Sequence, residues 1–186
     1  MKSTSDHSRR PALHRIELNL REITQLFNTM DPSPFNEKDL DHDAEEFIVS
    51  WAREFPLDEP LALLIHLDTL PPQEKPQTMI EQSIQHYFAY RVEINRLEFR
   101  HLMQDGRRSL ITGLVFLAAC LVVSNVLVGA GTGTVSSIAR ESLAIAGWVA
   151  MWRPMEIYLY DWWPLRRRER ILRKLSEMPV EVRKRG

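Results

Sequence analysis

The sequence predicts an α-helical membrane hairpin of two transmembrane helices, with a small N-terminal cytoplasmic α/β (β-α-β) unit and a long connecting helix. Three observations predict this fold class. A segment without any charged residue runs from Ser109 to Ala139. Two short apolar runs flank an amphipathic segment in the first 70 residues. Between these regions, apolar residues recur every three or four positions with no Gly or Pro.

Composition supports a chain with two different environments. The 186 residues suffice for one soluble domain and an additional element. The mean hydropathy of −0.27 averages a polar first half with one very apolar window. The only cysteine, Cys120, lies in that window, which excludes a disulfide scaffold and a cysteine-based zinc site. Residues 1–12 are polar, so we expect a disordered tail and no cleaved signal peptide.

Residues 13–75 are predicted to form the small cytoplasmic α/β domain. Arg15–Leu20 fits both a strand and a helix, and we favour a strand followed by a helical turn through Phe27. Leu61–Leu67 is a short apolar run bounded by Pro and Asp, which is typical of a buried strand. The crossover rule makes the two strands parallel. Two strands alone are marginal, so the long helix or a second copy of the chain would have to cover them.

The segment Glu37–Pro56 is predicted to be the helix between these strands. Its acidic residues lie in the first turns, where the helix dipole favours negative charge. The predicted apolar face consists of Leu40, Ala44, Phe47, Ile48 and Trp51.

Residues 76–108 are predicted to form a long helix or stalk. An almost continuous run into the first span is one of the arrangements that the pattern allows. Thr78–Asp105 would be ~40 Å long at 1.5 Å per residue. A coiled-coil seam is a less favoured alternative, because some heptad registers place Ser83, Arg91 and His101 in the core.

Residues 109–163 are predicted to form the transmembrane hairpin, with spans at about 109–128 and 141–161. The first span has the ~20-residue length needed to cross the hydrocarbon core. Its aliphatic residues outweigh Ser124 and Asn125 by several kcal/mol, at roughly 0.3 to 0.6 kcal/mol each. The Gly-rich segment Gly129–Ser137 predicts a turn. Ala146 and Ala150 would allow the two spans to pack closely.

The second span contains charged residues in its latter half. Arg153 lies past the midpoint of the span, so its side chain can reach the interface, and Glu156 is three residues away on the same helix face. Pro154 predicts a kink. These residues and the surrounding aromatic side chains are predicted to anchor the span at the membrane interface: Trp152, Arg153, Glu156, Tyr158, Tyr160, Trp162 and Trp163.

Residues 164–186 are predicted to form a basic cytoplasmic tail. Basic residues flank both spans on the sides away from the Gly-rich turn, which places both termini in the cytoplasm. We favour contact with anionic lipid headgroups over nucleic-acid binding for the bases that follow the second span. These are Arg166, Arg167, Arg168, Arg170, Arg173 and Lys174.

Catalytic, cofactor-binding and metal sites are not predicted. The acids of DLDHD (39–43) begin like a calcium loop, but Ala44 and Ser50 stand where such a loop needs Gly and Glu. His66 lies in a predicted strand and is interpreted as structural. In DPSPF, Asp31 can cap a turn, Pro32 and Pro34 stiffen it, and Phe35 can act as a hydrophobic staple, with Ser33 between the prolines. This segment is the candidate functional loop.

The motifs LFN, DPSPF and DLD, followed by two apolar spans, resemble a family of bacterial two-transmembrane membrane proteins of unknown function. The resemblance implies a location in the bacterial inner membrane and no particular activity.

The favoured function is a non-enzymatic, oligomeric membrane protein that presents its cytoplasmic domain for protein interaction or scaffolding. Its expected partners are membrane lipids and either further copies of the chain or another protein. The alternative is a subunit of a transport or ion pathway that uses Arg153, Glu156 and Asn125, because ionisable residues within spans are functional candidates.

Overall fold

The computed structural model describes residues 13–69, 76–130 and 134–185. The chain divides into two compact units. The sheet unit comprises residues 1–94 and 167–186, and the helical unit comprises residues 95–166. The predicted tail at 1–12 lies outside the described residues, as does most of the PPQEKPQ segment that precedes the long helix.

The sheet unit contains a three-stranded sheet in which every strand pair is parallel. Strands β1 (His14–Leu20) and β2 (Leu61–Leu67) pair with Ile16 opposite Leu63. The strand prediction for Arg15–Leu20 and the parallel pairing are therefore confirmed. A short 3-10 helix follows at Ile23–Gln25, where a helical turn was predicted.

A third strand, β3 (Val180–Lys184), occupies the second edge of β2. The basic-tail prediction for 164–186 overlooked this strand and helix α5 (Trp162–Ser176). The first four of its five residues, VEVR, alternate apolar and charged side chains, and Val180 lies opposite Leu63 in the central strand. Such a short alternation is not conclusive by itself, because the pairing partner lies far away in the sequence.

Helix α1 (His42–Glu54) connects β1 and β2 and is shorter than predicted. The Asp41 side chain caps it by accepting a hydrogen bond from the Asp43 amide. The predicted apolar face was partly wrong, because Ile48, Val49 and Ala52 are the buried residues of the helix. Phe47 and Trp51 are instead 39% and 42% exposed, and the centroids of their rings lie 6.0 Å apart.

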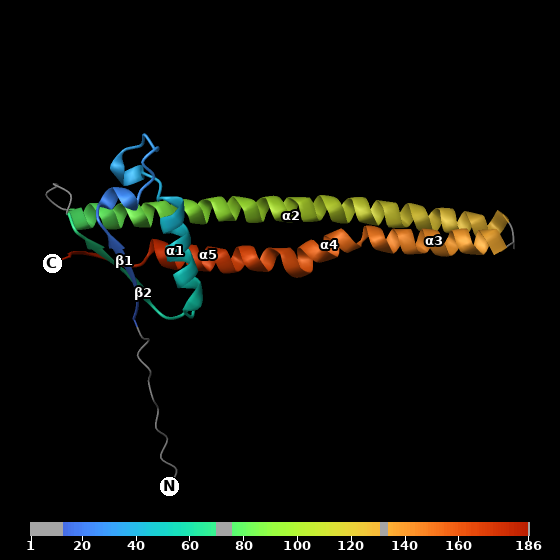
Figure 1. Ribbon diagram of the computed structural model, residues 1–186. Coiled ribbons are helices and arrows are strands. Elements are labelled where there is room, and N and C mark those ends of the chain that lie inside the picture. The colour runs from blue at the N-terminus through green and yellow to red at the C-terminus, as the bar shows by residue number, and fades with distance from the viewer. Residues whose placement is uncertain (1–12, 70–75, 131–133, 186) are drawn as a thin grey trace, which may run out of the picture. The chain divides into compact units, whose positions relative to one another are not determined.

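One face of the sheet carries the hydrophobic core. It is covered by α1, by the first turns of helix α2 and by α5 (Figure 1). The α2 and α5 residues in this core are Ile80, Ile84, Tyr87, Phe88, Val92, Ile171, Leu172 and Leu175. A small sheet needs a packed helix layer to be stable, and α5 completes that layer here. This helix lies more than 70 residues after the start of α2 in the sequence.

The opposite face of the sheet carries a different pattern of apolar and polar side chains. Ala62 and Leu64 of β2 are 5% and 4% exposed, although they point away from the core residues Leu63 and Ile65. The register places Glu17 of β1 and Glu181 of β3 on either side of Leu64. Long polar side chains at the two edges therefore flank an apolar central strand, which fits a parallel strand buried on both sides.

Helix α2 (Pro76–Ala130) has 55 residues and runs from the sheet unit through the helical unit without interruption. The predicted continuity of the long helix with the first span is confirmed. Among the described residues, the part Pro76–Val126 is the one helix long and apolar enough to cross a membrane. Only 17% of its most apolar window is buried.

After α2, the chain continues as a return segment that consists of three consecutive elements. These are α3 (Thr134–Ala150), α4 (Trp152–Glu156) and the π-helix η3 (Ile157–Asp161). The predicted turn at Gly129–Ser137 was too long at both ends, because α2 continues to Ala130 and α3 begins at Thr134. The intervening residues 131–133 lie outside the described residues. The second predicted span is thus divided among elements that do not individually reach the length of a span.

Small residues bring α2 and the returning segment together within the helical unit. A Cβ atom at Gly113 would lie 3.0 Å from the Ala150 carbonyl oxygen, and one at Gly147 would lie 2.6 Å from Leu117. Gly106, Gly113 and Cys120 are buried at seven-residue intervals along α2. The two helices therefore approach closely at Gly113 and Gly147, with Ala150 at one of these contacts, and their identity as two membrane spans stays a prediction.

Candidate functional site

The DPSPF segment lies in a loop of the sheet unit that is closed by backbone hydrogen bonds. Phe27 and Leu40 form an isolated antiparallel bridge. At this bridge the Asn28 amide donates to the Asp39 carbonyl at 2.8 Å, and the Asp41 amide donates to the Leu26 carbonyl at 2.9 Å. The loop thus starts and ends at the same place, which fixes its base on the hydrophobic core.

Asp31 organises the interior of this loop. Its carboxylate accepts hydrogen bonds from the Ser33 amide at 2.9 Å and from the Asp39 amide at 2.8 Å. The bond from the Asp39 backbone, followed by those from Ser33, lowers the pKa of the Asp31 carboxyl below its usual value. Asp31 therefore caps the turn, as predicted, and also connects the two sides of the loop.

Phe35 fixes the loop to the core. Its ring contacts that of Phe27 with centroids 4.7 Å apart, and its carbonyl accepts a hydrogen bond from the Ser83 hydroxyl at 3.2 Å. Pro32 and Pro34 are exposed. Proline rings in a loop with a fixed base reduce the number of conformations available to it, so the loop surface is well preorganised.

A hollow of about 300 Å³ lies between this loop and helix α2. It is lined by Asp31, Ser33, Glu37, Asp39, His86, Tyr87 and Tyr90. Three of these residues carry carboxylates, and Tyr90 exposes 56% of its surface. An aromatic ring beside several carboxylates favours a cationic group, such as a Lys or Arg side chain of a binding partner.

Sequence reasoning missed a polar network beside this hollow. The Glu45 carboxylate accepts a hydrogen bond from the Tyr87 hydroxyl at 2.8 Å and pairs with the Arg91 guanidinium at 2.7 Å. Burial, and then the bond to Glu45, raise the pKa of Tyr87 well above its usual value. The network connects α1 to α2. The i, i+4 spacing of Tyr87 and Arg91 was its only visible signal, and the partner Glu45 lies more than 40 residues away.

The predicted interface anchors lie on α4, η3 and the beginning of α5. Arg153 Nη1 lies 3.0 Å from Glu156 Oε2, as predicted, and also 3.1 Å from Asp161 Oδ2. Trp152, Tyr160 and Trp163 are each about two-thirds or more exposed. Tyr158 is exposed as well, and Trp162 donates its indole N–H to the Tyr158 carbonyl.

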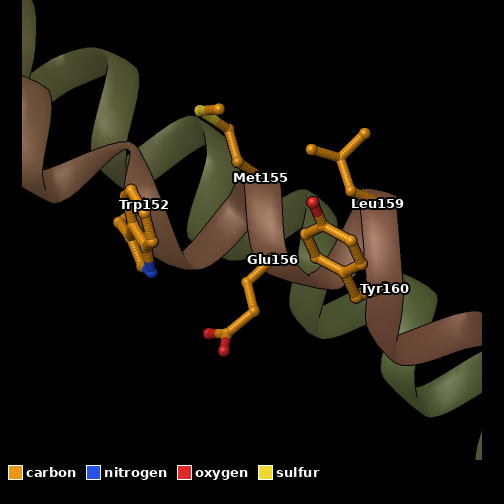
Figure 2. A pocket seen from close by; sticks show the side chains of 5 residues that line it. All are labelled: Trp152, Met155, Glu156, Leu159 and Tyr160. Carbon is orange, nitrogen blue, oxygen red and sulfur yellow. The ribbon is translucent and has the colours of Figure 1, made fainter.

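A surface groove of about 170 Å³ crosses the same segment of the helical unit. Figure 2 shows the side chains that line it: Trp152, Met155, Glu156, Leu159 and Tyr160. Asn125 does not belong to this region. On α2, the residue that lies against Ala150 is Gly113, which is twelve positions before Asn125. The Asn125 side chain is exposed, whereas that of its neighbour Ser124 is buried.

The predicted lipid-contacting bases have several different environments. Arg166 lies over the Phe99 ring at 4.9 Å, and Arg173 pairs with Glu169 at 2.8 Å. The Lys174 ammonium donates to the Pro56 carbonyl at 2.7 Å, and its burial lowers its pKa. Arg167 and Arg170 are exposed, and Arg168 lines a hollow beside α1. Contact of these side chains with lipid headgroups stays a prediction.

In the part of the chain that the structure describes, no group of three or more His, Cys, Asp or Glu side chains is arranged to hold a metal ion. No family model matches the chain, and no match was found among curated proteins or solved structures. The resemblance of the LFN, DPSPF and DLD motifs to a bacterial membrane family therefore stays a prediction.

Proposed function

We propose that this chain is a non-enzymatic protein of the bacterial inner membrane that presents its sheet unit for protein interaction. The observation that carries the proposal is the exposed apolar surface of the helical unit. Ile111, Val115 and Val122 of α2 are each more than 60% exposed, and so are Ile145 and Val149 of α3. Exposed aliphatic surface of this extent is unfavourable in water and favourable in lipid.

The pairing of β3 with β2 supports two crossings of the membrane. The two strands lie in one sheet, although β2 precedes the apolar part of α2 and β3 follows the return segment. If α2 crosses the membrane, the chain must cross back before residue 180 for this pairing to form. The helical elements of the return segment are individually shorter than a span, and the sheet supplies an independent reason for a second crossing.

The distribution of basic residues supports a cytoplasmic location for both ends. Arg107 and Arg108 precede the apolar part of α2, and Arg166 and Arg167 follow the return segment. Arg140 is the one basic residue near the Gly-rich turn. The positive-inside rule then assigns the sheet unit to the cytoplasm, with the anchors at the inner interface.

Two exposed features of the sheet unit support a role in protein interaction. The first is the acidic hollow beside the DPSPF loop, where Tyr90 and the carboxylates are accessible. The second is the exposed ring pair of Phe47 and Trp51 on α1. Aromatic residues on a rigid surface are enriched in protein interfaces, and the acidic hollow favours a partner segment that contains Lys or Arg.

Topology is tested by cysteine labelling in a Cys120→Ser background. Single cysteines replace Ser137, beside the Gly-rich turn, and Asp68, after β2, and intact cells with a permeabilised outer membrane are treated with a membrane-impermeant maleimide. The proposal expects labelling at 137 and protection at 68 until the inner membrane is opened. Recovery of the chain in the soluble fraction, or equal labelling at both positions, would contradict the membrane part of the proposal.

Partner binding is tested by site-specific photo-crosslinking from position 90 or position 51 in cells. A photoreactive residue at exposed Thr24 is the matched control. Cross-linked products from positions 90 or 51, absent from the control, support an interaction surface. Their absence, together with a monomer by light scattering in detergent, would exclude both the protein partner and the oligomer.

A further inference from the structure

The groove on the return segment combines an apolar track with a carboxylate between two aromatic rings. Trp152, Glu156 and Tyr160 are four residues apart and follow one another along one row of the helix, as Figure 2 shows. Met155 and Leu159 form the neighbouring row. The groove therefore offers polar and apolar binding surfaces side by side.

Glu156 of the groove belongs to a charged cluster with Arg153 and Asp161, which lie beside the groove and do not line it. Arg153 faces two carboxylates, those of Glu156 and Asp161, at 3.0 and 3.1 Å. The three side chains carry a formal charge of −1. Both contacts use the same guanidinium nitrogen, Nη1. The excess negative charge favours an ammonium group beside Glu156, and the guanidinium has further N–H groups that can donate to a phosphate.

Trp152 and Tyr160 are each 70% exposed, so their rings are accessible to a ligand at Glu156. Aromatic faces attract ammonium groups, and a nearby carboxylate strengthens that attraction. Met155 and Leu159, which are 46% and 54% exposed, provide an adjacent surface for a hydrocarbon chain. Together with the Arg153 guanidinium, these surfaces correspond to the three parts of a zwitterionic phospholipid. Glu156 and the two rings match its ammonium, Arg153 matches its phosphate, and Met155 and Leu159 match its acyl chains.

We propose that this groove binds a membrane phospholipid with an ammonium headgroup, and the inference rests on the proposed membrane location. The ammonium lies against Glu156 between the Trp152 and Tyr160 rings. The phosphate faces Arg153, and an acyl chain follows Met155 and Leu159. The Arg153 cluster then has a recognition role in addition to anchoring the return segment.

The experiment uses the full chain purified in detergent and native mass spectrometry. Phosphatidylethanolamine, phosphatidylcholine and phosphatidylglycerol with identical acyl chains are added separately. We expect either ammonium lipid to be retained about tenfold more strongly than phosphatidylglycerol. Glu156→Gln should remove this preference, and Trp152→Leu with Tyr160→Leu should reduce it several-fold while keeping an apolar surface. Glu141→Gln, at an exposed carboxylate on α3, is the matched control and should leave it unchanged.

Equal retention of all three lipids, or the same result for Glu156→Gln and Glu141→Gln, would overturn the inference. Preference for a Lys-containing peptide over every lipid would overturn it too, because the groove would then be a protein site. A carbonate wash of membranes separates this failure from that of the proposed function. A chain that stays in washed membranes but binds lipids indifferently contradicts the lipid groove alone, whereas a soluble chain contradicts both proposals.

Discussion

Helix α2 buries large side chains in its first part and small ones in its later part. In the sheet unit, its buried residues include Ile84, Phe88 and Val92, which fill a hydrophobic core. In the helical unit, its buried residues include Gly113 and Cys120, while the large aliphatic side chains point outwards. One uninterrupted helix therefore changes the kind of residue that it buries along its length.

The proposed membrane location accounts for this difference, because the two parts of α2 would then face different media. In water, helix packing is driven by removing large apolar side chains from solvent. In lipid that driving force is absent, and helices pack through small residues that allow close approach. The contrast within α2 therefore supports the proposed membrane location by an argument from contacts, which is independent of the argument from hydropathy.

The largest effect is expected from Val180→Asp in β3. Val180 is 2% exposed in the core of the sheet unit, and an unpaired carboxylate there should lower the free energy of unfolding by about 4 kcal/mol. Urea unfolding of the full chain, followed by hydrogen exchange of the β2 amides, measures this change. Arg185→Asp introduces a carboxylate at an exposed neighbouring position and should change little. Equal effects of the two variants would mean that β3 is not part of the core.

A smaller effect is expected from Gly113→Leu in the helical unit. A side chain at this position meets the Ala150 carbonyl, which is backbone and cannot move independently. Overpacking of this kind costs about 1 to 3 kcal/mol and should lower the thermal unfolding temperature of the unit in detergent. Ala118→Leu adds the same side chain on an exposed position of α2 and should be tolerated. If Gly113→Leu were tolerated equally, the close packing of small residues would be refuted.

Tyr87→Phe should lower stability by about 1 kcal/mol at neutral pH, because Glu45 loses a hydrogen-bond donor. The pKa of Tyr87 is raised in the folded state above its usual value of 10.0. Above pH 10 the unfolded chain loses the phenolic proton first, so the wild-type protein loses stability as the pH rises. The Tyr87→Phe variant has no phenolic proton at this position, so its stability does not fall for this reason as the pH rises.

Urea unfolding of both proteins between pH 7 and pH 11 measures the effect of Tyr87→Phe. The difference in stability between them should shrink above pH 10. A difference that stays constant over this range would show that the hydroxyl does not titrate differently in the two states.

The smallest effect is expected from Asp31→Asn in the DPSPF loop. The folded pKa of Asp31 lies below its usual value of 3.8, so its contribution is present above that pH and is lost as the pH falls through the folded pKa. The protection factor of the Asp39 amide against hydrogen exchange, taken relative to the intrinsic rate at each pH, should therefore fall in acid in the wild-type protein. In the variant, this protection factor should already be low at neutral pH and should lack the acid transition. Asp58→Asn, an exposed carboxylate outside the loop, is the control and should behave as wild type.

Local patterns in the sequence were sufficient for several elements. The alternation of Ile16 and Leu18 identified β1, and the uninterrupted period between Ile80 and Leu102 identified the long helix. Asp31 was correctly assigned to a turn, because a short carboxylate side chain next to proline caps the backbone nearby. These interactions join residues close together in sequence, so the residue types alone specify them.

Partners distant in sequence account for what was missed. The network of Glu45 and Tyr87 depends on the packing of α1 against α2, and the contact between Lys174 and the Pro56 carbonyl depends on where α5 returns. The outward position of Phe47 and Trp51 could not be read from hydrophobicity, because their helix had equally apolar residues to bury. Neither residue type nor spacing specifies which of two apolar faces meets the sheet.

By itself, the sequence determined that this chain has a long helix, an apolar segment, a parallel pair of strands and a stiffened DPSPF loop. Each follows from short-range periodicity, turn chemistry or composition. Only the tertiary structure decided that the C-terminal residues form β3, that α5 completes the core, and that glycines bring α2 and α3 together. A five-residue strand has too little intrinsic preference to be recognised alone, and its stability comes from pairing with β2 across more than a hundred residues.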